Sequence, residues 1–144
     1  MAMSADLDKL IADFRKMPLD TRRKLRTEIR RVAAPVLSQV RSNAGWSSRI
    51  PAATTIKVGY SKSKSGATIV TSARKAPHAR PYEHDGVPGT FRHPVNRPAA
   101  RRRKPWVSQA ARPFFYRAVS EAAPKVEDGF RELIMRVARE NGWK

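Results

Sequence analysis

The stretch TTIKVGYSKSKSGATIVTSA, residues 54 to 73, decides between an all-helical fold and a mixed one. Its first part alternates, placing Thr54, Ile56, Val58 and Tyr60 on one face of an extended chain. Its last part, ATIVTSA, is rich in the β-branched residues that favour strands. The polar residues between them, SKSKSG, suit a turn or a longer hairpin tip. The stretch therefore predicts a β-hairpin over about residues 54–73.

Helical periodicity flanks this hairpin on both sides. The pattern over about residues 5–43 predicts two helices divided at Pro18, and Pro35 predicts a kink or a restart in the second. A long C-terminal helix is predicted over about 113–140, with Pro113 at its first position and a kink at Pro124. We therefore expect one α+β domain over residues 1–144, with N-terminal helices and a long kinked C-terminal helix packed on a small antiparallel β-sheet with extended loops.

A proline-rich and basic loop segment, residues 76–108, separates the hairpin from the last helix. Its prolines and glycines exclude long elements. A short helix or turn fits residues 79–84, and short strands fit 91–95 and 105–108. The sequence RPAARRRK, residues 97–104, is expected to form the loop between those strands.

Charge is the feature of the composition that points most directly to function. The 144 residues include 30 Lys and Arg against 12 Asp and Glu, a formal net charge of +18. The excess positive side chains repel one another in a compact chain. Such repulsion is usually tolerated where a polyanion or an acidic protein partner lies nearby. The chain has no cysteine, which excludes disulfides and thiolate metal sites. It has no recognisable signal peptide and no apolar run near about 18 residues, so we expect a protein made in a cytoplasm without membrane attachment.

Two sets of residues are candidates for functional surfaces. Cationic side chains cluster on the second predicted helix and in the RPAARRRK loop, and these are expected to face DNA or a partner: Arg22, Arg23, Arg26, Arg30, Arg97, Arg101, Arg102, Arg103 and Lys104. Residues at the start of the last helix are expected to serve the core or assembly: Trp106, Arg112, Pro113, Phe114 and Phe115. For Trp106, anchoring on the core is favoured over stacking on a base.

Catalytic chemistry has little support in the sequence. His78, His84 and His93 share a segment with Glu83 and Asp85, so a metal site or a general base remains open there. Their spacing matches no zinc signature, and no phosphate-binding glycine motif occurs. We therefore expect no enzyme activity and no cofactor.

Three stretches together carry a family resemblance: RRVAAPVLSQVRSNA (residues 30–44), ARPYEHDGVPGTFRHPV (79–95) and WVSQAARPFFYRAVSEAAPKVEDGFRELI (106–134). Their order resembles small tail-component proteins of long-tailed, lambda-like bacteriophages, variously called tail-completion, neck or head–tail joining proteins. The matching positions are Tyr82, Glu83, Gly86, His93-Pro94-Val95, Trp106-Val107 and Ala111-Arg112-Pro113-Phe114.

The resemblance implies a structural virion protein with no catalytic residues. It implies a homo-oligomer, a hexameric ring at the head–tail junction, next to connector, tail-terminator or tail-tube proteins. Double-stranded DNA would pass through that ring, in non-specific phosphate contact with the basic residues. The arginines could instead pair with acidic surfaces of neighbouring ring proteins, and the sequence leaves both possibilities open.

Two other classes of function also remain open. A standalone, sequence-independent nucleic-acid-binding protein explains the charge equally well, but not the arrangement from His93-Pro94-Val95 to the last helix. A small nuclease would depend on His84 or His93 and on a metal.

Overall fold

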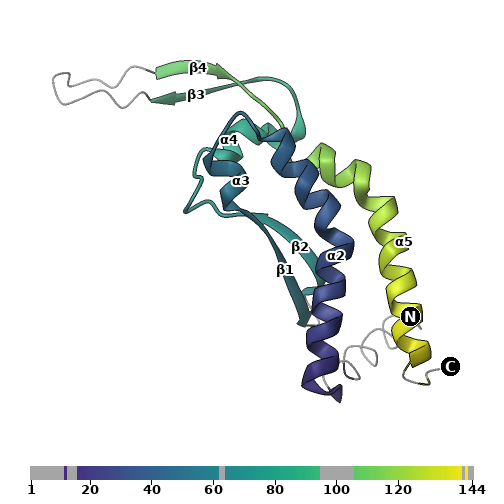
Figure 1. Cartoon of the computed structure of the whole chain (residues 1–144). Coiled ribbons are helices and arrows are strands. Elements are labelled where there is room, and N and C mark those ends of the chain that lie inside the picture. The colour runs from purple at the N-terminus through teal and green to yellow at the C-terminus, as the bar shows by residue number, and fades with distance from the viewer. Residues whose placement is uncertain (1–11, 13–15, 62–63, 95–105, 141, 143–144) are drawn as a thin grey trace.

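The computed structural model describes residues 12, 16–61, 64–94, 106–140 and 142 of the chain. Its fold is α+β, as the sequence predicts (Figure 1). Most of the helix predicted before Pro18 lies outside the described residues. The elements in chain order are α2 (Leu19–Asn43), α3 (Arg49–Ala53), β1 (Thr54–Ser61), β2 (Lys64–Thr71), α4 (Ala79–Glu83), the short 3₁₀ helix η1 (His84–Gly86), β3 (Thr90–Pro94), β4 (Trp106–Ala110) and α5 (Tyr116–Glu140).

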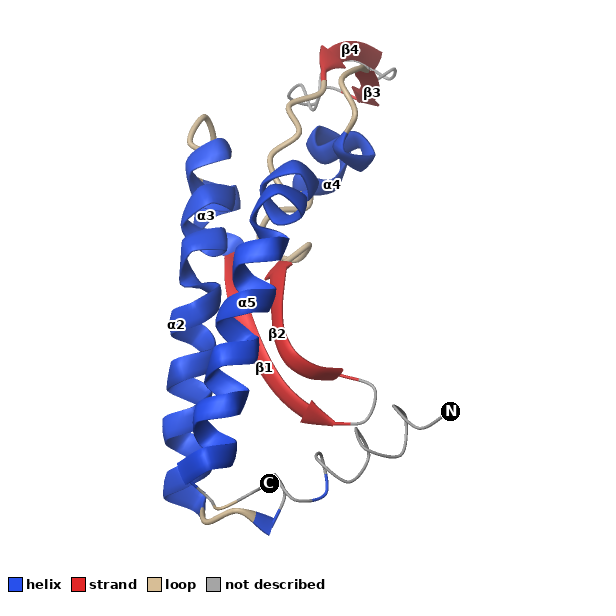
Figure 2. Ribbon diagram, turned by 90° about the vertical axis from the view of Figure 1, so that its right-hand side faces the viewer, coloured by secondary structure: helices blue, strands red, loops and turns tan. Residues whose placement is uncertain are grey.

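The two long helices, α2 and α5, lie side by side and form one layer of the molecule (Figure 2). The buried side of α2 is the apolar stripe expected from its sequence: Leu25, Ile29, Ala33, Val36 and Val40. The helix continues through Pro35, whose ring is exposed, so the predicted restart is absent. At Gly129 of α5 an added Cβ would stand 2.9 Å from Val32 Cγ1, so the glycine permits the close approach of the two helices.

The β1–β2 hairpin packs one face against the helix layer. Its register pairs Thr54 with Thr71 and Ser61 with Lys64, and its inward pairs include Ile56 with Ile69. The hydroxyl of Thr54 donates to the Ile50 carbonyl at 2.8 Å and lies 2.9 Å from the Thr71 hydroxyl. This buried polar contact fixes the start of the hairpin against α3.

The predicted single sheet is instead two separate two-stranded sheets among the described residues. The second, β3 with β4, pairs Thr90 with Ala110 and Pro94 with Trp106, close to the strand positions predicted from sequence. Figure 1 shows this hairpin projecting from the end of the molecule where α4 lies, away from the helices. We call β3 and β4 the arm.

Helix α5 begins at Tyr116, three residues later than predicted. Pro113 therefore precedes the helix, and the physical reason is a side-chain cap described below. The helix contains Pro124 and changes direction along its course in Figure 1. Its buried residues join two apolar clusters, one centred on Phe114, Val40 and Ile50, the other on Leu25 and Leu133.

Candidate assembly and nucleic-acid surfaces

Glu83, at the end of α4, caps the start of α5. Its side-chain carboxylate accepts hydrogen bonds from the backbone N–H groups of Phe114 (2.7 Å), Phe115 (2.8 Å) and Tyr116 (2.9 Å). These groups include the first helical N–H, which has no partner inside the helix, and a carboxylate there also complements the helix dipole. Glu83 is only 6% exposed, so the contact belongs to the interior.

Tyr82, the residue before Glu83, holds the base of the arm. Its ring lies 4.5 Å from that of Trp46 and 5.1 Å from that of Phe91, measured between centroids. Its hydroxyl accepts a hydrogen bond from the Gln109 side-chain amide, and His93 Nε2 donates to the Gln109 amide oxygen at 2.8 Å. These six residues, Trp46, Tyr82, Glu83, Phe91, His93 and Gln109, are referred to as the joint.

The chain leaves the joint through a left-handed turn. His84, Asp85 and Gly86 all have positive φ, of 48°, 55° and 78°. Only glycine adopts this region without cost, so the two preceding residues are strained, by about 1 kcal/mol or more each. His84 Nδ1 lies 3.1 Å from the Val87 carbonyl oxygen and helps to hold the turn, which redirects the chain from α4 into β3.

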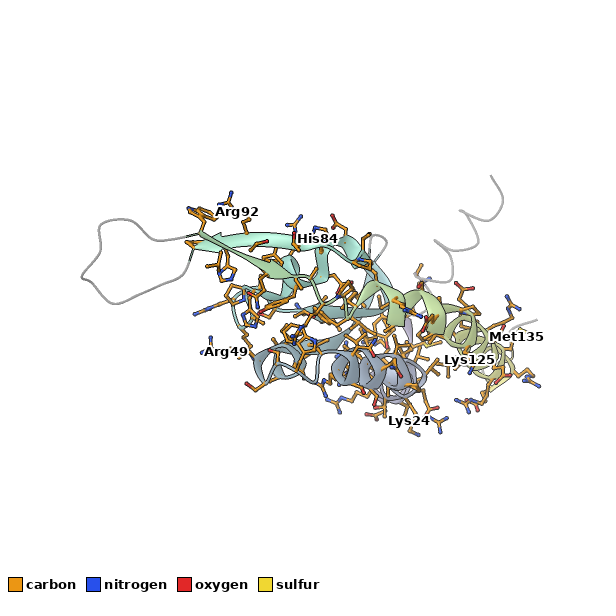
Figure 3. All side chains as sticks on the ribbon, turned by 90° about the horizontal axis from the view of Figure 1, so that it is seen from above. Lys24, Arg49, His84, Arg92, Lys125 and Met135 are labelled. Atoms are coloured by element: carbon orange, nitrogen blue, oxygen red, sulfur yellow. The ribbon has the colours of Figure 1, made fainter. Side chains whose placement is uncertain are left out.

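The arm beyond the joint exposes apolar surface. Trp106 is 59% exposed and Val107 is also exposed. Trp106 is therefore not a core residue, and its predicted role as a core anchor is wrong, because that end of the arm projects away from the helices. Arg92 lies on the same face of the ribbon as Trp106, and Figure 3 shows it out along the arm, far from Lys24 on α2.

The other predicted core or assembly residues take different places. Phe114 is 2% exposed and belongs to the core, and Phe115 packs against the same cluster. Arg112 is exposed, with its guanidinium carbon 5.4 Å from the centre of the Trp46 ring, a cation–π contact. Pro113 is half-buried beside the capped end of α5.

The predicted basic residues of α2 divide into two groups. Arg23 forms an exposed ion pair with Asp20 at 3.6 Å. Arg22, Arg26 and Arg30 follow one another at intervals of four residues, and Arg26 lies 5.7 Å from the centre of the Tyr60 ring on β1. The predicted loop residues Arg97, Arg101, Arg102, Arg103 and Lys104 lie outside the described residues.

A second charged region lies between α2 and α5. Glu28 accepts from Arg31 at 2.8 Å and from Arg136 at 2.9 Å, which links the two helices. The hydrogen bond from Arg136 is the largest cause that lowers the pKa of the Glu28 carboxyl, and the nearby positive charges add to it, whereas burial acts in the opposite direction. A groove of about 710 Å³ runs here, lined by both signs of charge. Its two acids, Glu28 and Glu140, interrupt the cationic lining.

The histidines do not gather into a metal site. Among the described residues, no three His, Asp or Glu side chains lie close enough together to hold a metal ion. His93 belongs to the joint, His84 to the left-handed turn, and the His78 ring packs edge-on against Tyr82 at 6.1 Å. Glu83, considered with them as a metal or general-base candidate, has its carboxylate engaged by three amides. In the described part of the chain, no helix is long and apolar enough to span a membrane.

Comparison with known proteins adds no family to this geometry. No family model matches the chain, and no curated protein or solved structure matches it either.

Proposed function

We propose that this chain is a structural subunit of the neck or tail of a long-tailed bacteriophage, which forms a ring at the head–tail junction through which DNA passes. The observation that carries the proposal is the joint. The motif residues Tyr82, Glu83, His93 and Phe114 are spread over 33 residues of sequence, and they meet in one structure that sets the arm against α5. The resemblance in sequence thus corresponds to one mechanical unit.

The arm suits assembly. It exposes Trp106 on one face and, to a smaller extent, Val107 on the other, and aromatic side chains such as tryptophan are enriched where proteins contact one another. A neighbouring copy, contacted in the same way by each subunit, would cover this surface. Head-to-tail contacts of that kind close into a ring when the rotation between subunits permits it, and six copies is the expected number.

Charge sets a condition on such a ring. Subunits of net charge +18 repel one another, so their association requires salt or a polyanion. DNA in the channel supplies the polyanion, and contacts to phosphates alone would let it slide. Acidic surfaces of connector, tail-terminator or tail-tube proteins would serve the same purpose at the rims.

The proposal includes no catalytic step and no cofactor. Under it the protein is made in the host cytoplasm and then resides in the virion.

The test is the mass of the particle. Nuclease-treated protein is examined by native mass spectrometry and light scattering, at several salt concentrations. A ring mass that gains population as salt rises supports the proposal. Trp106→Ala should shift the population toward monomer, whereas Met135→Ala is the matched control. Met135 is 57% exposed on α5, away from the arm (Figure 3). A monomer at every salt concentration, with and without DNA, would contradict the proposal for the isolated chain.

A standalone nucleic-acid-binding protein is the second candidate. The observation that favours it is the row of arginines on α2, which has no need of a ring. It predicts a monomer or small unit that reaches a defined stoichiometry only on addition of nucleic acid. Mass measurement in the presence of a short duplex therefore separates the two candidates.

A further inference from the structure

Arg22, Arg26 and Arg30 form a row along the side of α2 that faces β1. Residues four apart on a helix lie about 6 Å apart along its axis, so the row spans about 12 Å. One contact places it beside β1: the Arg26 guanidinium carbon is 5.7 Å from the Tyr60 ring centre. The charge of Arg30, one turn further along α2, also acts on the Tyr60 hydroxyl. We call Arg22, Arg26, Arg30 and Tyr60 the α2 cationic row.

The three arginines of this row have no counterion within the described residues. Other arginines on the long helices have partners: Arg31 pairs with Glu28, Arg117 with Glu121 and Arg131 with Asp128. Arg41 and Arg139 instead donate to backbone carbonyls, those of Thr54 and Met135. The Nε of Arg22 is buried and, in the described part of the chain, has no hydrogen-bond acceptor. A buried donor without an acceptor costs free energy, which an anionic oxygen placed beside it would recover.

Tyr60 adds a neutral group to the same surface. Burial raises the pKa of its hydroxyl, while a hydrogen bond from Arg26 and the charges of Arg26 and Arg30 act in the opposite direction. The net shift is upward, so the hydroxyl stays protonated at neutral pH and brings no negative charge to the row. The site therefore presents cations and a phenol, which disfavours cationic ligands and metal ions.

We propose that the α2 cationic row binds the phosphodiester backbone of nucleic acid. Guanidinium groups match phosphate oxygens with two parallel hydrogen bonds, and three of them in line suit a linear polyanion better than a single small anion. One strand of duplex DNA carries a phosphate about every 3.4 Å along the axis, so a row of about 12 Å faces three or four of them. The inference rests on the proposed function only in taking duplex DNA as the ligand.

The row lies apart from the arm, β3 and β4. It occupies the N-terminal half of α2, whereas the arm projects from the end where α2 finishes (Figure 1). Arg30 alone is about 20 Å from the end of the helix at Asn43, from the rise of about 1.5 Å per residue. A contact at the row is therefore separable by mutation from any contact made by the arm.

The experiment measures the salt dependence of DNA binding. A fluorescein-labelled random-sequence duplex is titrated with the full chain, and anisotropy gives Kd at several KCl concentrations. The variant Arg22→Gln/Arg26→Gln/Arg30→Gln should lower the slope of log K against log salt by about 2.7, at about 0.9 for each phosphate that the row no longer neutralises. When salt rises from about 50 to 200 mM, both proteins lose affinity for DNA. The fold-loss for the variant should be about 40 times smaller than the fold-loss for the parent protein.

A matched control removes the same charge from paired arginines. Arg31→Gln/Arg117→Gln/Arg131→Gln also lowers the net charge by three, and it should leave the slope near that of the parent. Equal slopes for the two triple variants would overturn the proposal, because total charge and not the row would then govern binding. A slope unchanged in the row variant would overturn it too. Circular dichroism melting checks that both variants fold.

A polyglutamate peptide of equal charge serves as the alternative ligand. If the row variant loses polyglutamate binding as strongly as duplex binding, the row recognises acidic protein and the proposal is overturned.

Ring mass is measured on the same variants. If the row variant has the reduced salt-dependence slope and still forms the ring, the row is a DNA site in the assembled protein. If neither the parent nor the variant forms a ring but the slope still falls in the row variant, the neck function is contradicted and the phosphate site is supported.

Discussion

Removing the Glu83 carboxylate should be among the most damaging single changes outside the apolar core. In Glu83→Ala three amide N–H groups lose their acceptor at once, and that of Phe114 is buried. An unpaired buried donor costs about 1–3 kcal/mol, and removal of a helix cap about 0.5–2 kcal/mol. The amides of Phe115 and Tyr116 can partly reach water. We therefore expect a loss of about 3–5 kcal/mol in the free energy of unfolding, a large share of the about 5–15 kcal/mol typical of a domain.

The conservative variant separates charge from shape. Glu83→Gln keeps one acceptor oxygen, but it presents an NH₂ group to a third amide and loses the charge that complements the helix dipole. Charge-assisted hydrogen bonds are about twice as strong as neutral ones, so we expect a loss of about 2 kcal/mol. Glu121→Gln is the control. Glu121 forms only an exposed ion pair with Arg117, and its removal should cost less than about 1 kcal/mol.

Urea unfolding followed by circular dichroism measures these differences, with equal m-values as the condition for comparing midpoints. With Trp106 and Trp143 replaced by phenylalanine, the fluorescence of Trp46, which contacts Tyr82, gives a probe local to the joint. A loss below about 1 kcal/mol for Glu83→Ala would refute the reasoning, since it would mean that water satisfies the helix end. If Glu83→Ala lowers the free energy of unfolding and Glu83→Gln does not, the contribution that we assign to the charge of the carboxylate is refuted.

Three further predictions concern the core and two titrating groups. Phe114→Ala should cost about 3–5 kcal/mol in urea unfolding, since the ring is fully buried, and a loss below about 1 kcal/mol would contradict a core role. Because the Tyr60 pKa is raised above its ordinary 10.0, the neutral form favours the folded state. That contribution is complete below pH 10 and is lost as pH rises through the folded pKa, so Tyr60→Phe should lose less stability above pH 10 than the parent, by urea midpoints. The Glu28 pKa is lowered, so its contribution is present above pH 4.5 and is lost as pH falls through the folded pKa. Glu28→Gln should therefore flatten the acid limb of stability, and an unchanged limb would contradict the link to Arg136.

Local patterns predicted the elements of this fold well. The alternation at Ile56 and Val58 and the stripe from Leu25 to Val40 reflect burial on one face, and the described strands and helices follow them. The division into two sheets was not predictable, because the period of a strand says nothing of which other strands it meets. Of the kink or restart predicted at Pro35, the restart is wrong: the exposed ring lets α2 continue past the missing backbone hydrogen bond.

The site was predicted in part. The excess of positive charge pointed to Arg22, Arg26 and Arg30 in the sequence. That they have no counterion among the described residues could be seen only in the structure, which shows where the acidic side chains lie. The role of Glu83 left no local signal, since its partners lie 31 to 33 residues away in sequence. A capping residue is normally sought just before its helix, where Phe114 and Phe115 have no side-chain acceptor to offer. Trp106 was assigned to the core because tryptophan usually buries its ring, and the projecting arm overrides that tendency.

The adjacent placement of Tyr82 and Glu83 has a mechanical consequence. One residue holds the arm through Gln109 and Phe91, and the next holds the first turn of α5, so both are fixed to the single short helix α4. The backbone adds to this, because Arg112 N–H donates to the Tyr82 carbonyl at 2.9 Å. The left-handed turn after Glu83 is strained, and strain of this kind persists only where surrounding contacts impose it. A force on the arm is therefore transmitted to α5 through two consecutive residues. In a ring, that coupling would make the direction of each arm, and so the position of the neighbouring subunit, depend on the packing of α5 against α2.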